Sequence, residues 1–237
     1  MIKRTEIQKI INDYDDLRIA VLGSHSALEI MDGAKDEGLD TIVFCQKGRE
    51  TPYQRFDRIA DEIKILKKFG DMSSAKNQKM LRDTSTIIVP HRSLTAYLGY
   101  KVIENSLNVP IFGNRALFQA EERNNKKNQY YLLKKARIKY PKIFKNPKDI
   151  NKPAIVKVQE KKRKLERAFF TVSSFSDYKK KSADKIKQGT IAKTDLQNAT
   201  IEQLAIGTYL NFNYFHTPIS KNVDFIGIQR RLQTNIH

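Results

Sequence analysis

The segment that most constrains the fold is residues 17–38, which reads LRIAVLGSHSALEIMDGAKDEG. Its first five residues form a β-type run that ends before Gly23, and apolar residues with helical spacing follow over 26–35. Gly38 is placed to end this helix, and a second apolar strand is predicted over 41–45. A strand, a helix and a strand in this order predict a right-handed parallel unit that opens an α/β domain.

The same alternation continues along the first half of the chain. A short amphipathic helix over 5–14 is expected before the first strand. Further strands are predicted over 62–66, 85–90 and 109–112, and helices over 74–82 and 93–104. Strands separated by helices make an open parallel sheet, because each connection crosses a face of the sheet.

The second half of the chain has a different pattern. Residues 115–138 are charged and helical in period, and we expect two helices there. Strands are then predicted over 142–145, 154–158, 168–172, 190–193, 200–204, 209–215 and 224–230, with one helix over 175–187. This is typical of an α+β, largely antiparallel module. We place the boundary near residue 122, which gives domains 1–122 and 123–237.

The chain has a formal net charge of +18, from 44 Lys and Arg against 26 Asp and Glu. Such a balance is typical of nucleic-acid binding, of a site for several phosphates, or of a lysine-rich proteome. Many lysines occur in short runs inside segments of helical period, which is typical of a solvated helix face. We therefore do not expect nucleic acid to be the main partner.

Other features of the sequence bear on its location. No run of about 18 apolar residues is present, so no membrane helix and no membrane partner are expected. The N-terminal residues lack the apolar core of a signal peptide. Cys45 is the only cysteine and cannot form an internal disulfide, so we expect a cytoplasmic protein.

A first candidate site follows the first strand. Ligands of open parallel sheets bind beyond the carboxyl ends of the strands, and the start of a helix there favours a phosphate. Ser24 and Ser26 flank His25, which can add a donor or a charge. The alternative is that Ser26 is an ordinary N-cap and His25 a packing residue. The turn lacks the G-x-G-x-x-G pattern, which disfavours a dinucleotide.

A second polar turn follows the strand over 85–90. His91, Arg92 and Ser93 are expected at the same edge of the sheet, with Ser93 as a helix N-cap. Arg92 could pair with an anion or simply be solvated. Two polar helix starts at one sheet edge indicate a ligand site more strongly than one.

The second module contains a lysine in an apolar strand, at Lys157 of AIVKVQ. Burying it is costly unless it is paired, so it either reaches solvent from an edge or holds a phosphate. Residues 201–207 read IEQLAIG and could form a hinge that offers its backbone to a planar base. The four histidines show no metal-ligand spacing, and neither a Ser-His-Asp triad nor a P-loop is indicated.

Several segments carry a family resemblance when they are taken together. In order along the chain they are SHSALEIMDGAKDEG, FCQKGRETPYQRF, VPHRSLTAYLG, FGNR, PAIVKVQEKKRKLERAFFTVSS, IEQLAIGTYLNFNYFHTPI and IGIQRRLQTN. They resemble the archaeal 5-formaminoimidazole-4-carboxamide ribonucleotide synthetases, which are ATP-grasp ligases. The similarity spans residues 17–237.

The resemblance implies a fold and a reaction. The fold would be an α/β pre-ATP-grasp domain with a parallel sheet, followed by an α+β ATP-grasp domain. The enzyme would convert formate and ATP to formyl phosphate. The amino group of aminoimidazole carboxamide ribonucleotide (AICAR) would attack it to give FAICAR in IMP biosynthesis. ATP and Mg²⁺ or Mn²⁺ are the implied cofactors, and a homo-oligomer is a further expectation.

The resemblance also implies roles for individual residues. His25 and Ser93 would bind AICAR, and Lys157 would contact the phosphates of ATP. The adenine hinge would be formed by Glu202, Gln203, Leu204 and Ala205, and Asp224 would lie near the nucleotide. No catalytic residue is indicated.

The sequence departs from the family pattern at the hinge, where Gln203 and Leu204 replace expected acidic and aromatic residues, a change that backbone contacts to adenine tolerate. Two further departures bear on activity. ATP-grasp domains normally cover the phosphates with a glycine-rich loop, whereas residues 160–168 read EKKRKLERA. Side-chain cations would have to replace the glycine backbone there. The family also continues beyond the position of His237, so we expect an incomplete ATP-grasp domain without the magnesium carboxylates. The alternatives are a paralogous ligase for another carboxylate or acceptor, and a non-catalytic basic protein that binds nucleotides or RNA.

Overall fold

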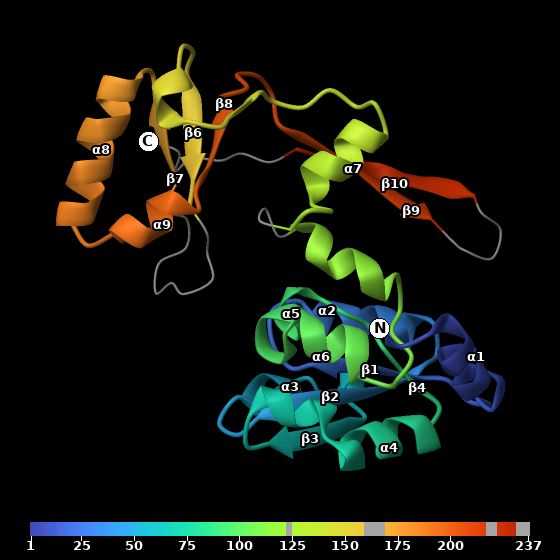
Figure 1. The fold of residues 1–237 in the computed structure, drawn as a ribbon. Coiled ribbons are helices and arrows are strands. Elements are labelled where there is room, and N and C mark those ends of the chain that lie inside the picture. The colour runs from blue at the N-terminus through green and yellow to red at the C-terminus, as the bar shows by residue number, and fades with distance from the viewer. Residues whose placement is uncertain (122–124, 159–168, 217–221, 231–237) are drawn as a thin grey trace. The chain divides into compact units, whose positions relative to one another are not determined.

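The computed structural model describes residues 1–121, 125–158, 169–216 and 222–230 (Figure 1). The chain divides into two compact units, which we call unit 1 (Met1–Glu121) and unit 2 (Glu122–His237). Among the described residues, no helix combines the length and the apolar character needed to cross a membrane.

Unit 1 is built on a four-stranded parallel sheet. Its strand order is β3-β2-β1-β4, so the first strand lies inside the sheet and the chain winds outward in both directions. The strands are β1 (Arg18–Leu22), β2 (Asp40–Gln46), β3 (Glu62–Leu66) and β4 (Thr86–Ile88).

Helices cover both faces of this sheet. Successive residues of β1 and β2 belong to different hydrophobic clusters, because side chains of a strand alternate between its two faces. Leu22 and Phe44 join one cluster, whereas Val21 and Val43 join the other. The α-helices are α1 (Arg4–Asn12), α2 (Ala27–Asp36), α3 (Thr51–Arg55), α4 (Ala75–Asp83), α5 (Arg92–Leu98) and α6 (Tyr100–Asn105). Short 3₁₀ helices are η1 (Asp57–Ile59), η2 (Phe69–Ser73) and η3 (Arg115–Glu121).

Unit 2 contains a four-stranded antiparallel sheet and a separate two-stranded one. The larger sheet has the order β5-β8-β6-β7, and α8 packs against β7 (Figure 1). Its strands are β5 (Ile143–Phe144), β6 (Ala154–Lys157), β7 (Phe169–Val172) and β8 (Thr200–Gln203). The smaller sheet pairs β9 (Leu210–His216) with β10 (Val223–Arg230). The helices are α7 (Gln129–Lys135), η4 (Pro147–Asp149), α8 (Phe175–Lys187) and α9 (Lys193–Gln197).

Three predicted elements differ from the structure. The helix expected over 93–104 is two helices, because Gly99 adopts a φ of 77° that breaks the hydrogen-bond pattern. The strand expected over 109–112 is reduced to one bridge between Ile88 and Ile111. The strand expected over 190–193 is wrong: the Asp195 carboxylate accepts from the Ala192 N–H (2.8 Å) and starts α9 there.

Candidate functional site

The strand order of unit 1 creates a topological switch point between β1 and β4. The chain leaves β1 for β2 on one side, and β4 pairs with β1 on the other. Crevices form at the carboxyl ends of the strands where the winding direction changes. The turn over 23–26 and the segment over 89–93 therefore meet at one edge of the sheet.

The first turn is held tightly to the sheet. The Gly23 N–H donates to the Phe44 carbonyl of β2 at 2.8 Å. His25 is exposed and has a φ of 48°, which is uncommon for a residue with a Cβ. Ser26 is the N-cap of α2, the position that the alternative interpretation gave it, but its side chain does not cap the helix. Its hydroxyl instead forms a 2.7 Å hydrogen bond with His25 Nδ1.

His91 links the second turn to the first. Its Nε2–H donates to the Leu22 carbonyl at 2.8 Å, and its Nδ1 accepts from the Ser93 N–H at 3.3 Å. This pairing describes a neutral ring with its proton on Nε2. Burial lowers the pKa of His91, helped by the nearby His25, while the Leu22 bond and the Glu29 charge act in the opposite direction. The rings of His25 and His91 are stacked, with centroids 6.2 Å apart.

Ser93 is not the helix N-cap that the sequence predicted. His91 occupies that position, and its ring nitrogen accepts the hydrogen bond that a serine hydroxyl usually accepts. Ser93 lies inside the first turn of α5 and is 8% exposed. The structure thus brings His25, His91 and Ser93 to one edge, with the exposed Arg92 between the last two.

Sequence reasoning missed a third contribution, from the segment after β2. A Cβ on Gly23 would lie 3.0 Å from Tyr53 Cε2 and 3.2 Å from Cys45 Sγ, so these groups pack against the turn. Burial raises the pKa of Tyr53 to about 12 and that of Cys45 to about 11. Glu50 Oε2 is buried and has no hydrogen-bond partner among the described residues. The signal was available, because residues 47–53 follow a buried parallel strand at the same edge.

In unit 2, Lys157 is half-buried and lies beside a carboxylate. It is the last residue of β6 and pairs in register with Thr200 of β8. Its Nζ forms an ion pair with one carboxylate oxygen of Glu202, and the Tyr130 hydroxyl of α7 donates to the other. Glu202 is only 5% exposed. The apolar strand around Lys157 indicated that this lysine needs a partner, and Glu202 is that partner.

The predicted hinge continues from Glu202 along the chain. The backbone N–H of Gln203 donates to Lys142 O and that of Leu204 to Pro153 O, both at 2.8 Å. The Ala205 carbonyl accepts from the Tyr209 hydroxyl at 2.9 Å. Next to this edge is an open pocket of about 280 Å³, lined by Lys139, Tyr140, Pro141, Gln203 and Ala205.

Asp224 belongs to the other sheet of unit 2. It is exposed on β10, opposite Phe215 of β9, in the two-stranded sheet. The glycine-free stretch over 160–168 lies outside the described residues. Within the described part of the chain, no group of three or more His, Cys, Asp or Glu residues is placed to hold a metal ion.

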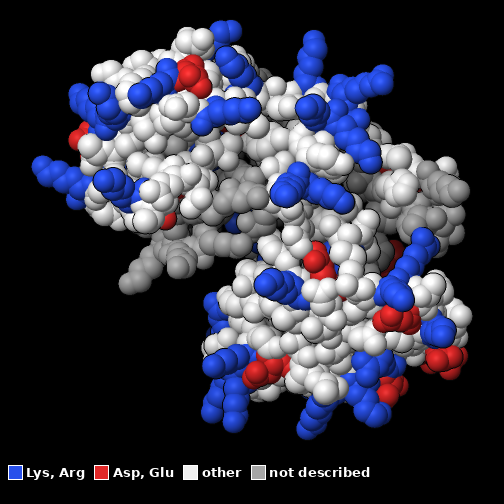
Figure 2. All heavy atoms as spheres, in the orientation of Figure 1, with Lys and Arg blue, Asp and Glu red and all other residues white. Residues whose placement is uncertain are grey.

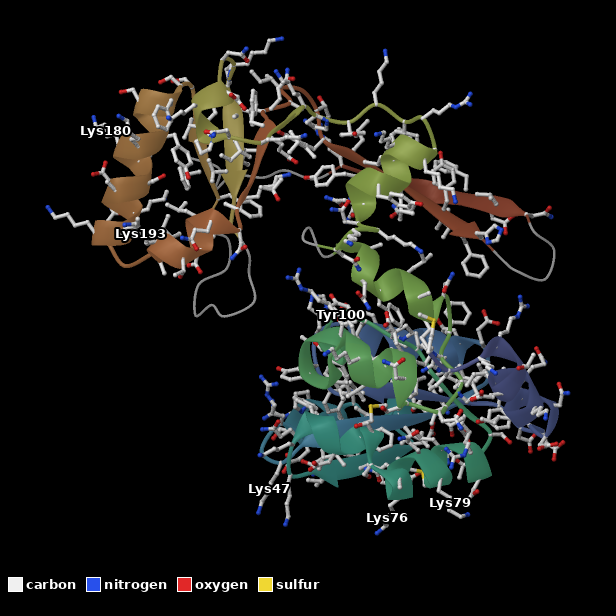
Figure 3. All side chains as sticks on the ribbon, viewed as in Figure 1. Lys47, Lys76, Lys79, Tyr100, Lys180 and Lys193 are labelled. Carbon is white, nitrogen blue, oxygen red and sulfur yellow. The ribbon has the colours of Figure 1, made fainter. Side chains whose placement is uncertain are left out.

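The two units differ sharply in charge. Of the 44 Lys and Arg residues, 26 lie in unit 2, together with only 9 of the 26 Asp and Glu residues. Figure 2 shows basic side chains well in excess of acidic ones on the visible face of unit 2. In unit 1, Lys76 and Lys79 of α4 point away from the sheet, as expected for a solvated helix face (Figure 3). The basic excess of the protein therefore belongs almost wholly to unit 2.

Comparison with solved structures agrees with this architecture. The IMP biosynthesis protein PurP from Thermococcus kodakaraensis matches with a TM-score of 0.62 at 20% identity, over 91% of this chain and 60% of that one. N5-carboxyaminoimidazole ribonucleotide synthetase from Thermotoga maritima matches with a TM-score of 0.58 at 15% identity, over 91% and 53%. The predicted fold class, a parallel α/β domain followed by an ATP-grasp α+β domain, is confirmed.

Comparison of sequences gives the family. The chain is 42% identical, over its full length, to 5-formaminoimidazole-4-carboxamide-1-(beta)-D-ribofuranosyl 5'-monophosphate synthetase from Methanopyrus kandleri, and it spans 65% of that protein. Residues 177–237 match the model described as "Domain of unknown function (DUF1297)". Residues 19–144 match the model described as "Protein of unknown function (DUF1246)". Since this second match covers more than half of the chain, the protein belongs to the DUF1246 family.

Proposed function

We propose that this chain forms the AICAR- and ATP-binding part of an ATP-dependent carbon–nitrogen ligase. The ligase would formylate AICAR with formate to give FAICAR in purine biosynthesis. One observation carries the proposal: the whole chain aligns at 42% identity with a protein named as a synthetase of that product. The contacts of the two candidate sites support it.

Unit 1 is proposed to bind AICAR at the switch point. The first turn of α2 offers backbone N–H groups, and such groups favour the phosphate of a nucleotide. His25 is exposed beside them and can donate to a phosphate or to a polar group of the imidazole ring. Ser93 is proposed to contact the same ligand. His91 supports the site by joining Leu22 of β1 to the start of α5.

Unit 2 is proposed to bind ATP at the pocket beside residues 203–205. Tyr140 gives the pocket an aromatic ring, and Gln203 and Ala205 of the hinge line it beside this ring. Lys157 projects from the end of β6 and would contact the phosphates, while Glu202 and Leu204 complete the hinge. Asp224 of β10 is proposed as a further contact to the nucleotide. The basic excess of unit 2 suits a ligand with concentrated negative charge.

The proposed chemistry depends mainly on positioning and charge. A formate oxygen would attack the γ-phosphorus of ATP, which forms formyl phosphate and releases ADP. The amino nitrogen of AICAR would then attack the formyl carbon, lose a proton and expel phosphate. Lys157 would neutralise charge on the transferred phosphoryl group. Among the described residues, no group of three or more His, Cys, Asp or Glu is placed to hold Mg²⁺.

The proposal is tested by calorimetry with ATP on this chain. Lys157→Met should weaken ATP binding by about tenfold or more, because it removes a charge-assisted contact to phosphate. Lys152→Met is the matched control, since Lys152 is exposed and precedes the same strand. AICAR binding should be unchanged in both variants. Equal ATP affinity for Lys157→Met and the native chain would overturn the ATP site.

A paralogous ligase is distinguished by its substrates. Native chain that binds ATP but not AICAR would favour another acceptor, and a panel of carboxylates and aminoimidazole nucleotides would identify it. In that case the unit 2 assignment survives and the unit 1 assignment fails.

The charge of unit 2 favours one candidate of a different class, a protein that binds RNA. RNA binding through lysines would weaken steeply between about 50 and 200 mM salt, because bound phosphates release counterions. Fluorescence anisotropy with a labelled single-stranded RNA measures this directly. Salt-sensitive RNA binding that ATP does not displace, together with no ATP binding by calorimetry, would replace the ligase proposal.

A further inference from the structure

Glu202 is held by two residues from different elements. Lys157 of β6 pairs with Oε1 of its carboxylate, and the hydroxyl of Tyr130, from α7, donates to Oε2. Both Glu202 and Tyr130 are almost fully buried, at 5% and 9% exposure. The cluster therefore connects the four-stranded sheet to α7, a helix that lies outside both the sheet and the hinge.

Each oxygen of the carboxylate has its own donor. A buried carboxylate is costly unless its lone pairs are satisfied, so both donors matter to its burial. With Lys157 alone, the carboxyl group could rotate about its last torsion, because such sp² torsions are broad. The Tyr130 hydroxyl removes this freedom. Tyr130 of α7 therefore determines the orientation of the Glu202 carboxylate, and with it the orientation of the ion pair with Lys157.

The ring of Tyr130 makes a second connection, to the pocket itself. It lies 5.9 Å from the ring of Tyr140, centroid to centroid, with 55° between the planes. This centroid distance lies within the range of favourable aromatic pairs. Tyr140 is 37% exposed and lines the pocket with Gln203 and Ala205. Tyr130 thus touches, from the buried side, both the ion pair and the aromatic wall of the pocket.

We propose that Tyr130 is a positioning residue for the nucleotide site of unit 2. Its hydroxyl orients Glu202 and through it Lys157, and its ring supports Tyr140 against the base. The inference rests on the proposed ATP site. It adds that α7, which the sequence shows only as part of a charged helical stretch, fixes the distance between the base pocket and the phosphate-binding lysine.

The test separates the hydroxyl from the ring. Tyr130→Phe keeps the ring contact with Tyr140 and removes the hydrogen bond to Glu202. It should weaken ATP binding by about tenfold in calorimetry, because Glu202 and with it Lys157 lose the orientation that suits the phosphates. Tyr131→Phe is the matched control: it is the next residue of α7, is 42% exposed, and should bind ATP like the native chain.

A double-mutant cycle distinguishes positioning from a general loss of structure. In a Glu202→Leu background, Tyr130→Phe should cause no further loss of ATP affinity, because the carboxylate that Tyr130 positions is absent. A merely structural role predicts the same fold-change in both backgrounds. Equal losses in the two backgrounds would therefore overturn the inference, even if Tyr130→Phe binds ATP weakly.

The remaining outcomes also decide the matter. Should Tyr130→Phe fail to fold cooperatively, Glu202→Asp provides the second measurement, since it keeps the charge for Lys157 but shortens the reach to Tyr130. An unchanged ATP affinity in Glu202→Asp would then overturn the inference, and a loss of about tenfold would support it. Native ATP affinity in a folded Tyr130→Phe variant overturns this inference alone. No ATP binding by the native chain overturns both this inference and the ATP site.

Discussion

The imidazole rings of His25 and His91 lie 6.2 Å apart, centroid to centroid, with 21° between their planes. One follows β1 and the other follows β4, and these two strands are neighbours in the sheet only because the winding direction changes there. The bond from His91 Nε2 to the Leu22 carbonyl fixes one ring to the end of β1. The exposed ring of His25, whose Nδ1 bonds to the Ser26 hydroxyl, stacks on this fixed ring and can face a ligand.

This arrangement predicts that His25 contributes to AICAR binding. His25→Ala should weaken AICAR binding by about tenfold or more, as expected when a donor to a charged ligand is removed. The measurement is calorimetry with AICAR on the native chain and the variant. ATP affinity should be unchanged, since Lys157 and the 203–205 edge belong to unit 2.

The matched control is another exposed histidine. His216→Ala changes the last residue of β9 in unit 2 and should leave AICAR affinity at the native value. If His25→Ala binds AICAR as tightly as this control, the assignment of the switch-point site to AICAR is wrong.

The second prediction concerns the pH dependence of stability. Burial holds the pKa of His91 below its ordinary value of 6.5, so the folded chain binds this proton less readily than the unfolded chain. The stability that the neutral His91 ring contributes is fully present above pH 6.5, and it is lost as the pH falls toward the lowered pKa of the folded chain. Urea unfolding should show the free energy of unfolding decreasing below pH 6.5, by no more than about 1.4 kcal/mol per pH unit for one proton.

His91→Gln isolates this effect. Glutamine keeps a donor for the Leu22 carbonyl but has no proton to gain, so the variant should lose less stability than the native chain between about pH 7 and pH 5.5. Identical slopes for the native chain and His91→Gln in this range would show that His91 does not titrate on unfolding.

The regular elements with a clean pattern could be predicted closely. β3 spans Glu62–Leu66 and α8 spans Phe175–Lys187, the same bounds as the sequence predicts. In each of them the sequence period is not interrupted. The prediction of one helix over 93–104 is wrong at Gly99, where the backbone takes a positive φ and the helix ends. The apolar spacing continues across this break and so does not reveal it. Composition alone does not distinguish a tolerated glycine from one that ends a helix.

The local sequence pattern also predicts part of the candidate site. An apolar strand around Lys157 indicates that the lysine needs a partner, but the partner depends on strand pairing. Glu202 becomes that partner because β8 lies antiparallel beside β6. Tyr130 could not be found, because nothing in its charged surroundings indicates that its hydroxyl is buried. Contacts between distant elements are the part that local patterns do not contain.

The third prediction concerns the packing around Gly23. A Cβ there would lie 3.0 Å from Tyr53 Cε2, 3.1 Å from Val43 Cγ2 and 3.2 Å from Cys45 Sγ, which is tighter than ordinary contact. Gly23→Ala should therefore lower the free energy of unfolding by about 1–3 kcal/mol, the usual cost of overpacking a core. Urea unfolding measures the change.

Gly33 of α2 provides the opposite case for this prediction. It is exposed, and a Cβ there would meet nothing within 4 Å. Gly33→Ala should raise the free energy of unfolding by about 0.5–1 kcal/mol, because alanine favours a helix interior. A Gly23→Ala variant as stable as Gly33→Ala would mean that the turn after β1 can move away from Tyr53 at little cost.

The last prediction concerns Arg115, which the family resemblance included in FGNR without a role. Its guanidinium donates to the carbonyls of Leu107 and Val109, both at 2.7 Å, and to that of Ile103. Arg115, the first residue of η3, therefore holds the end of α6 and the segment that follows it in place. Burial lowers the pKa of its guanidinium. Arg115→Met keeps much of the side-chain volume but leaves these acceptors unpaired, so it should destabilise the chain by about 3 kcal/mol.

Arg55→Met, on the exposed end of α3, is the control for this prediction and should change stability by less than about 0.5 kcal/mol. Urea unfolding of both variants decides the matter, because equal stabilities would show that water replaces the guanidinium at those carbonyls.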